Sequence, residues 1–278
     1  MKTVPIVHIK KNAPKQKGIN GYIYQKVFWK NDRNPMKIIL NGANGRMGKE
    51  IIKCTEKNYR GAELAAGADL FGDGEYKHIY DIDVKGDCII DFTSHLATQE
   101  VCDYAVKTNT PVVLSATGHT KDEVEIIKKA SESVPVFFAS NMSVGVALLV
   151  QLAKLTAKAM PDADIEIVEI HHNRKKDAPS GTALTLANAI KEVREDAEFV
   201  YGRSGNAPRD AKDIGIHAVR MGNIVGTHEV IVGTDTQTIT LKHEAHDRAL
   251  FAEGAVCAAE FLVQQKPGLY SMQDMLEF

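Results

Sequence analysis

The chain has 278 residues, of which 44% are hydrophobic and 25% are charged, and its formal net charge is −2. That length suffices for two domains with hydrophobic cores, and the composition is ordinary for a globular protein. No apolar run reaches the roughly 18 residues that span a bilayer, which argues against a membrane protein. The cysteines show neither a CxxC pair nor a metal-ligand spacing, so we expect reduced thiols, a cytoplasmic location and no metal site: Cys54, Cys88, Cys102 and Cys257.

Residues 1–35 form a basic segment that differs from the rest of the chain. They hold eight Lys or Arg and one acid, a charge of +7, so the other residues carry −9. This acidic body argues against nucleic acid as a partner. The segment lacks a sustained helical or strand period, and a clear strand begins at Met36. We expect residues 1–35 to be an extension outside the fold, with Met36 as the natural start. A transit peptide is the alternative, although the segment has no Ser and favours Lys over Arg.

A strand–turn–helix pattern opens the body of the chain. The strand Lys37–Leu40 leads into the turn Gly42-x-x-Gly45-x-x-Gly48, and a helical pattern follows through Ile51. This is the context that dinucleotide binding requires. Gly42 permits the tight turn, Gly45 permits close approach of a pyrophosphate, and Gly48 lets the helix pack on the strand. A turn with a purely structural role is the alternative interpretation of this motif alone.

An acidic residue closes the second predicted strand. That strand, Glu63–Ala68, ends at Asp69, which lies 21 residues beyond Gly48. A carboxylate at this strand end can accept hydrogen bonds from the hydroxyls of the adenosine ribose. A solvated acid at a loop edge is the alternative, and the position after the glycine turn favours the ribose role.

Strands and helices continue to alternate as far as residue 139, which predicts an α/β domain with a doubly wound, Rossmann-like parallel sheet. Ligands of such sheets bind at the carboxyl ends of the strands, so residues 115–117 and 139–142 should lie over a nicotinamide. The elements expected here are strands Asp87–Phe92, Pro111–Leu114 and Pro135–Ala139, with helices Leu96–Val106 and Lys121–Ser133.

A helix from Ser143 to about Ala159 should lead into a second, α+β domain. Sequential strand-like runs with short links then indicate an open mixed, largely antiparallel sheet, whose exposed face an oligomer often covers. These runs are Asp164–Ile170, Gly215–Arg220, Val225–Val232 and Thr238–Leu241, with a helix after Ser180 to about Glu195 and an irregular stretch at 202–213. A final helix is expected over Leu250–Leu262.

The segment from Glu169 to Ala183 carries the most informative chemistry. Imidazoles and cations follow a strand: His171, His172, Arg174, Lys175 and Lys176. Ser180 then stands at the N-cap of the next helix, whose free amides and dipole favour an anion. A proton donor, fixed cations and a helix N-terminus together suit a small carboxylate that is protonated during reaction. A solvated basic turn before an ordinary helix is the alternative.

This segment resembles the signature of the 4-hydroxy-tetrahydrodipicolinate reductase family, E-x-H-H-x-x-K-x-D-A-P-S-G-T-A, matched without a gap from Glu169 to Ala183. The likeness covers residues 36–278. It includes the G-A-x-G-R-M-G turn and the D-F-T at Asp91–Thr93. In the loops over the nicotinamide, Ser115 and Ala116 depart from the family's G-T, so side-chain roles there are in doubt.

The resemblance implies a hydride transfer from NAD or NADP to a small cyclic dicarboxylate, 4-hydroxy-tetrahydrodipicolinate, in a homotetramer. It implies that His171 is the proton donor and acceptor and that Lys175 is a second donor. The implied substrate-binding residues are His172, Ser180, Gly181 and Thr182. The implied cofactor-binding residues are Gly42, Asn44, Gly45, Arg46, Met47, Gly48, Asp69, Ser115, Ala116, Thr117, Ala139, Ser140, Asn141 and Met142.

The resemblance also implies a discontinuous first domain. The tail from Gly268 to Met272 is similar to a family ending that folds back on the nucleotide domain. We expect residues 36–142 plus 249–278 to bind dinucleotide, and residues 143–248 to bind substrate and to oligomerise.

Cofactor preference can be inferred from the residue after Asp69. Leu70 stands where NADPH-preferring members carry Arg, and Asp69 would repel a 2′-phosphate. We therefore expect NADH to be at least as good as NADPH. Two rival interpretations remain: a dehydrogenase of aspartate or homoserine, and a dinucleotide-binding regulator without catalysis. The dehydrogenase need not carry the signature that runs to Ala183, and the regulator has no use for His171 and Lys175.

Overall fold

The first sheet contains six strands, all parallel, in the order β11-β5-β4-β3-β1-β2. The structure is a computed structural model that describes residues 35–72 and 74–276. Side chains such as Ile38, Ile39, Ile89 and Ile90 are fully or almost fully buried, as expected for strands covered on both faces. The strands are β1 Met36–Asn41, β2 Ala62–Ala68, β3 Cys88–Asp91, β4 Val112–Leu114, β5 Pro135–Phe138 and β11 Gly268–Tyr270.

Two pairs of helices cover this sheet. The helices α2 (Arg46–Glu56) and α7 (Ala249–Leu262) pack together on one face, and α3 (Thr98–Thr108) and α4 (Lys121–Ser131) pack together on the other. The first turn of α4 is fixed by a capping box, because Thr120 and Glu123 exchange side chain to backbone hydrogen bonds. Three 3-10 turns, Tyr59–Gly61, Ile79–Asp81 and His95–Ala97, and a short C-terminal helix, α8 (Met272–Leu276), complete this part.

The second sheet is mixed and has the order β10-β9-β6-β8-β7. The strand β9 runs antiparallel to both neighbours, whereas β6, β8 and β7 are mutually parallel. The strands β8 and β9 follow each other in the chain but do not pair, since β6 lies between them. The bounds are β6 Asp164–His171, β7 Glu198–Tyr201, β8 Asp213–Arg220, β9 Gly226–Thr234 and β10 Gln237–Ala245.

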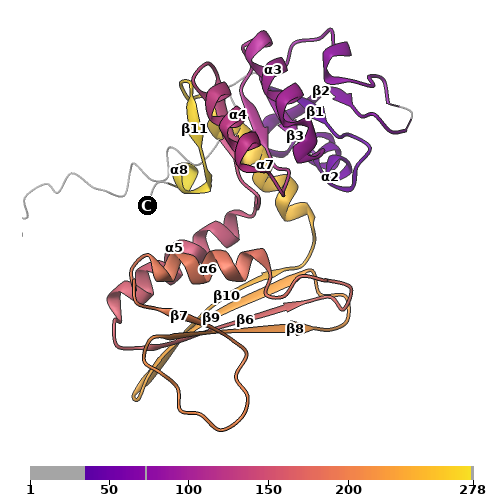
Figure 1. Cartoon of the computed structure of the whole chain (residues 1–278). Coiled ribbons are helices and arrows are strands. Elements are labelled where there is room, and N and C mark those ends of the chain that lie inside the picture. The colour runs from indigo at the N-terminus through magenta and orange to yellow at the C-terminus, as the bar shows by residue number, and fades with distance from the viewer. Residues whose placement is uncertain (1–34, 73, 277–278) are drawn as a thin grey trace, which may run out of the picture. The chain divides into compact units, whose positions relative to one another are not determined.

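Two helices, α5 (Val144–Ala159) and α6 (Gly181–Lys191), cover one face of this sheet (Figure 1). The burial of β6 alternates strictly, so Ile165, Ile167, Glu169 and His171 face the helices. Their neighbours include Val230 and Val232 of β9 and the apolar sides of both helices. Two buried polar side chains, Glu169 and His171, thus continue a row of apolar core residues toward the end of β6.

The predicted fold class is confirmed, with a few local differences. The edge strand β7 was not predicted, because its four residues lie between a helix and an irregular stretch and carry no clear alternation. The helix after Ser180 ends at Lys191 rather than near Glu195, since Arg194 turns to donate to the carbonyls of Met160 and Ala163 at 2.6 and 2.7 Å. The predicted extension, residues 1–35, lies outside the described residues except for Pro35.

Two further observations concern residues 35–72 and 74–276. None of their helices combines the length and the apolar character needed to cross a bilayer. They also contain no group of three His, Cys, Asp or Glu side chains placed to hold a metal ion.

Candidate active site

The glycine turn after β1 has the geometry that its sequence predicts. Gly42 has a φ of +89°, which favours glycine, and its carbonyl accepts from the Gly45 amide at 3.1 Å. A Cβ on Gly48 would stand 2.1 Å from the Gly42 oxygen, so only glycine lets α2 start this close to the strand. The first turn of α2 contains no acidic residue. The helix therefore presents amide groups and a positive dipole end to an incoming anion.

Asp69 fastens the loop after β2 to this turn. Its carboxylate is 9% exposed and accepts from the Asn44 amide at 2.8 Å and from the Phe71 amide at 2.9 Å. The Asn44 side chain in turn donates to the Phe71 carbonyl. Each carboxylate oxygen of Asp69 keeps a second lone pair for a ligand hydroxyl. Next to it, Leu70 and Phe71 are 60% and 78% exposed and offer an apolar surface.

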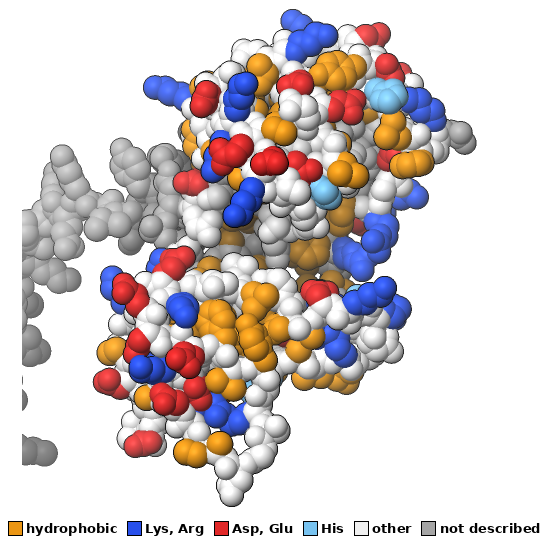
Figure 2. All heavy atoms as spheres, viewed as in Figure 1, with side chains coloured by type: hydrophobic (Ala, Val, Ile, Leu, Met, Phe, Trp, Pro, Cys, Tyr) orange, Lys and Arg blue, Asp and Glu red, His pale blue; other side chains and the backbone are white. Residues whose placement is uncertain are grey.

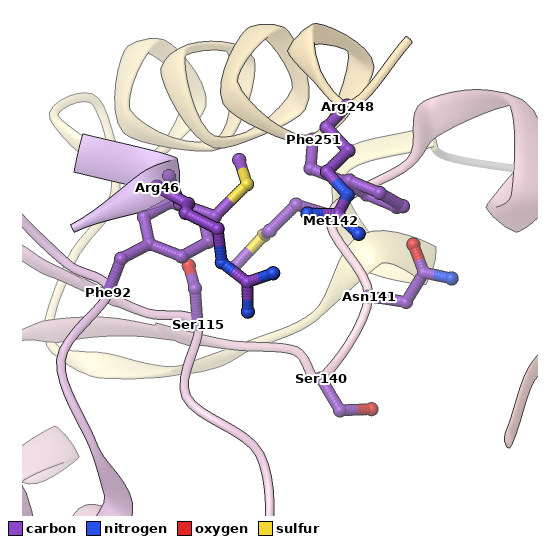
Figure 3. A pocket seen from close by; sticks show the side chains of 9 residues that line it. Arg46, Phe92, Ser115, Ser140, Asn141, Met142, Arg248 and Phe251 are labelled. Carbon is purple, nitrogen blue, oxygen red and sulfur yellow. The ribbon is translucent and has the colours of Figure 1, made fainter. Parts of the chain in front are cut away.

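A pocket of about 280 Å³ opens at the carboxyl ends of β3, β4 and β5 (Figure 3). Six predicted cofactor residues line it: Arg46, Met47, Ser115, Ser140, Asn141 and Met142. Figure 3 shows the Arg46 and Ser115 side chains reaching into the same space from α2 and from the loop after β4. The Ser115 hydroxyl is buried and has no hydrogen-bond partner among the described residues. It is therefore available to a ligand in this pocket.

Three pocket residues escaped the sequence prediction. Phe92 belongs to the D-F-T motif but was given no role, and Arg248 and Phe251 lie at the start of α7. Arg248 follows Arg46 by about 200 residues in the chain. The two line the same pocket only because the chain returns to the first sheet. The other predicted cofactor residues lie outside the pocket lining, on α2 and on the loops after β1, β2, β4 and β5: Gly42, Asn44, Gly45, Gly48, Asp69, Ala116, Thr117 and Ala139.

A second cluster lies at the end of β6, around Glu169 and His171. The Glu169 side chain is fully buried, and its Oε2 atom is 2.5 Å from the Nδ1 atom of His171. Arg220, at the end of β8, donates to both carboxylate oxygens at 2.7 and 2.8 Å. The backbone amide of Ser180 donates to Oε1 at 3.0 Å. One buried carboxylate therefore connects β6, β8 and the start of α6.

The electrostatics of this cluster follow from burial and pairing. Burial would raise the Glu169 pKa, but hydrogen bonds from Arg220, His171 and the Ser180 amide outweigh it and hold that pKa below its usual value. Burial lowers the pKa of His171, although the Glu169 carboxylate acts in the opposite direction. The cluster thus holds an ionised carboxylate, a guanidinium and an imidazole in a dry setting.

The loop after β6 carries the predicted cations. Arg174 and Lys176 are exposed, whereas Lys175 is half-buried with its ammonium 2.8 Å from the Asp177 carboxylate. Figure 2 shows Lys and Arg side chains gathered beyond the carboxyl end of β6. His172 donates its amide to the Ile224 carbonyl at 2.8 Å, and its Nδ1 atom is buried with no hydrogen-bond partner among the described residues. The two adjacent lysines thus have different surroundings.

Ser180 fixes the start of α6 through its contacts with Glu169, His228 and Ala183. The Ser180 hydroxyl accepts from the Ala183 amide at 3.2 Å and lies 3.0 Å from the Nε2 atom of His228. Ser180 is 2% exposed, so its hydroxyl is committed to the helix cap rather than open to a ligand. Gly181 is exposed, and Thr182 accepts a hydrogen bond at 3.1 Å from Asn141 of the pocket. This bond links the two groups of predicted site residues.

Glu169, Arg220 and His228 were not predicted as site residues. Glu169 opens the signature, and alternation on β6 places it on the same face as His171, so this signal was present in the sequence. The Arg220 contact depends on the pairing of β8 with β6, where Arg220 stands opposite His171. His228 of β9 stands opposite Glu169 of β6, where the two strands pair.

A Rossmann-like domain with a glycine turn, joined to a second domain with a buried His–Glu–Arg cluster and a cationic loop, defines a class of dinucleotide-binding oxidoreductases. Family models for the N-terminus and the C-terminus of dihydrodipicolinate reductase match residues 36–142 and 145–276. The chain belongs to the dihydrodipicolinate reductase family.

Relatives and solved structures agree with this membership. The chain is 42% identical over 248 residues to the 4-hydroxy-tetrahydrodipicolinate reductase of Caldanaerobacter subterraneus subsp. tengcongensis, covering 87% of this chain and 98% of that protein. It is 42% identical over 266 residues to the enzyme of the same name from Syntrophus aciditrophicus, covering 87% and 99%.

A structure of dipicolinate-bound dihydrodipicolinate reductase from Paenisporosarcina sp. TG-14 shares the fold. Its TM-score is 0.74 at 24% identity, covering 86% of this chain and 98% of that one. The family models and the relatives confirm the resemblance inferred from the signature, and the curated relatives are oxidoreductases. This membership sets aside the two rival interpretations.

Proposed function

We propose that this chain reduces 4-hydroxy-tetrahydrodipicolinate to tetrahydrodipicolinate with hydride from a nicotinamide dinucleotide, in the diaminopimelate route to lysine. The observation that carries this proposal is the His171–Glu169–Arg220 cluster, which stands between a cationic loop and the start of α6. The names of the relatives support the same reaction.

The residues present fit a dinucleotide. The glycine turn leaves room for a pyrophosphate at the start of α2, and Arg46 and Arg248 supply cations beside it. The free, buried Ser115 hydroxyl offers a hydrogen bond in the same pocket. When bound, the nicotinamide supplies the hydride. Gly42, Asn44, Gly45, Gly48, Asp69, Ala116, Thr117 and Ala139 shape the surrounding loops, and Met47, Ser140, Asn141 and Met142 join Ser115 in the pocket wall.

The substrate is a dicarboxylate, and the loop after β6 can bind two anionic groups. Gly181 and Thr182 open α6, where amides and the helix dipole stabilise a carboxylate. His172 offers a buried ring nitrogen without a partner in the described chain. The Lys175 ammonium and the exposed cations Arg174 and Lys176 raise the local positive potential on an otherwise acidic protein.

His171 is the proposed proton donor and acceptor. Hydride addition leaves electron density that a proton must neutralise, and an imidazole that titrates near neutrality suits this role. Its Nδ1 atom is held by Glu169, which leaves Nε2 for the reacting group. Lys175 is the proposed second donor, and its ion pair with Asp177 positions the ammonium before substrate binds.

NADH is proposed to be at least as good a cofactor as NADPH. Asp69 lies at the end of β2, where an ionised carboxylate attracts ribose hydroxyls and repels a 2′-phosphate. Leu70 provides no positive charge to compensate. Two cations of α2, Lys53 and Arg46, are the alternative source of compensating charge. Lys53 is paired with Glu50 at 2.8 Å, and Arg46 lines the pocket.

Domain roles and assembly complete the proposal. Residues 36–142 plus 249–278 form the dinucleotide-binding domain, and residues 143–248 bind substrate and build a homotetramer in the cytoplasm. The pairing of β11 with β5 supports this division. In the described chain, helices cover one face of the second sheet, and its other face presents half-buried Val168, Ile170 and Ile231. A second subunit would remove that apolar surface from water.

Oxidation of NADH on addition of enzymatically generated substrate tests the reaction. We expect turnover with this substrate and none with aspartate or homoserine. The His171→Gln variant, purified in the same way, should show almost no turnover. Activity on aspartate or homoserine instead would contradict the proposal.

A further inference from the structure

We propose that Glu169, held by Arg220, is a positioning residue that fixes the protonated nitrogen and the orientation of the His171 ring. This inference rests on the proposed function, in which His171 is the proton donor. It assigns to Glu169 and Arg220 a role that acts through His171 rather than through contact with substrate.

The first support is the complete occupation of the Glu169 carboxylate. Oε1 accepts from the Arg220 Nη2 atom at 2.7 Å and from the Ser180 amide at 3.0 Å. Oε2 accepts from the Arg220 Nη1 atom at 2.8 Å and faces the His171 Nδ1 atom at 2.5 Å. A two-point guanidinium contact fixes the plane of the carboxylate. The plane in turn fixes where the imidazole must lie.

The second support is the tautomer that this geometry imposes. An ionised carboxylate only accepts hydrogen bonds, so His171 must carry a proton on Nδ1. Its Nε2 atom is then the nitrogen that gains and loses a proton. A Cβ at Gly226 would stand 3.0 Å from Nε2, so the glycine spares that atom the contact that any other residue at this position would make.

The third support is the charge around the ring. Burial lowers the pKa of His171, the Glu169 carboxylate raises it, and Lys175 and Arg220 lower it further. His228, whose ring centre is 5.1 Å away, is held neutral by burial, with its pKa lowered to about 4. Glu169 is thus the one anion, among the described groups that shift this pKa, that stabilises the imidazolium form of His171.

Replacement of Glu169 by Gln makes a specific prediction. Arg220 and the Ser180 amide both require an acceptor at the Oε1 position, so the amide oxygen of Gln should take that place. The Gln NH2 group then stands at the Oε2 position, where the hydrogen bond from the Arg220 Nη1 atom is lost. It donates to the His171 Nδ1 atom, which moves the ring proton to Nε2. The tautomer of His171 and the charge at position 169 would both change, while the side chain at position 169 keeps its size.

Steady-state kinetics of Glu169→Gln provide the first test. We expect kcat to fall roughly 10²–10⁴-fold, the contribution of a general acid or base, with KM changed much less. The high-pH limb of the kcat profile should move to lower pH by about one unit or more, since the variant lacks the charge that favours the imidazolium. Glu169→Asp, which keeps the charge, should recover part of kcat and restore the limb.

The matched control is Glu260→Gln. Glu260 is also a buried glutamate paired with an arginine, Arg60, but it lies on α7 away from this cluster. It should lower thermal stability and leave kcat and the pH limb unchanged. Equal kinetic losses in both variants would mean that Glu169 acts only through stability, and would overturn the inference.

A direct readout on the unmodified enzyme keeps the inference testable if Glu169→Gln fails to fold. Nitrogen NMR of the His171 ring, assigned by loss of its signals in His171→Gln, should show a protonated Nδ1 in the neutral form. A neutral ring protonated on Nε2 would overturn the inference. Retention of kcat in His171→Gln would instead contradict the proposed function itself. With His171 essential, a normal pH profile and kcat in Glu169→Gln would refute only the positioning role.

Discussion

His228 of β9 stands directly opposite Glu169 of β6 and touches the helix cap of α6, with its Nε2 atom 3.0 Å from the Ser180 hydroxyl. The imidazole is 4% exposed, and burial, together with nearby His171, lowers its pKa to about 4. It therefore stays neutral in the folded protein across the range in which a solvated histidine titrates. His228 therefore makes a structural contact, and its lowered pKa makes the stability of the fold depend on pH.

The first prediction concerns stability in acid. Between about pH 6.5 and pH 4 the unfolded chain protonates His228 and the folded chain does not, so the free energy of unfolding falls as the pH falls. The shift corresponds to about 3 kcal/mol, lost over this window. In His228→Gln this contribution should vanish, and denaturant unfolding at several pH values measures it. The comparison must be between variant and wild type, because Asp91, with a pKa raised by burial to about 6, acts in the opposite sense.

Ser180→Ala is the control for this experiment. It removes the helix cap but keeps the imidazole, and should cost about 1 kcal/mol at every pH. In Ser180→Ala, the slope of the free energy of unfolding against pH should equal that of the wild type. A His228→Gln slope equal to that of Ser180→Ala would show that His228 binds its proton alike in the folded and unfolded chains, and would contradict the lowered pKa.

The second prediction concerns His171. The His171→Gln variant should fold and bind dinucleotide normally, because its side chain lies on β6 and not in the pocket lined by Arg46 and Ser115. Turnover should fall roughly 10²–10⁴-fold, the contribution of a general acid. Cofactor titration by fluorescence and steady-state kinetics measure the two effects. The exposed His78, changed to Gln, is the control and should leave both unchanged.

The third prediction separates two adjacent lysines. Lys175 is half-buried and paired with Asp177, whereas Lys176 is exposed. Lys175→Ala should lower kcat strongly, since it removes a directed ammonium from a partly desolvated site. Lys176→Ala should raise KM modestly, and added salt should diminish the effect because about 10 Å is the screening length at 0.1 M. Equal losses of kcat would indicate a diffuse cationic surface with no single catalytic lysine.

The fourth prediction concerns the choice of cofactor. The kcat/KM with NADH should at least equal that with NADPH, because Asp69 repels the 2′-phosphate. Leu70→Arg should raise kcat/KM for NADPH and change the NADH value little, since the new guanidinium would reach only the extra phosphate. Kinetics with both cofactors provide the measurement. A wild-type advantage of tenfold or more for NADPH would contradict the assignment of Asp69.

Local sequence patterns were enough for most of the elements, for the strand that ends at His171 and for the loop after it that carries Lys175. The periods of strands, turns and helices depend on residues that are close in the sequence. A glycine such as Gly48 indicates a close approach of two backbone segments that no other residue permits. Pairing partners are not encoded locally. The insertion of β6 between β8 and β9, and therefore the contact of Arg220 with Glu169, follows from the whole sheet. For the same reason Arg248 and Phe251 could not be placed in the pocket from sequence.

The strand that completes the first sheet, β11, is also the last strand of the chain, and α7, which covers one of that sheet's faces, directly precedes it. A growing polypeptide emerges from the ribosome N-terminus first. The apolar residues of β3, β4 and β5 that face α7 must therefore wait for residues more than a hundred positions later. The β6–β10 sheet and its two helices use one continuous segment and can be complete before then. The six-stranded sheet therefore contains the first strands to be synthesised, yet it can be completed only after residues 249–270 have been made.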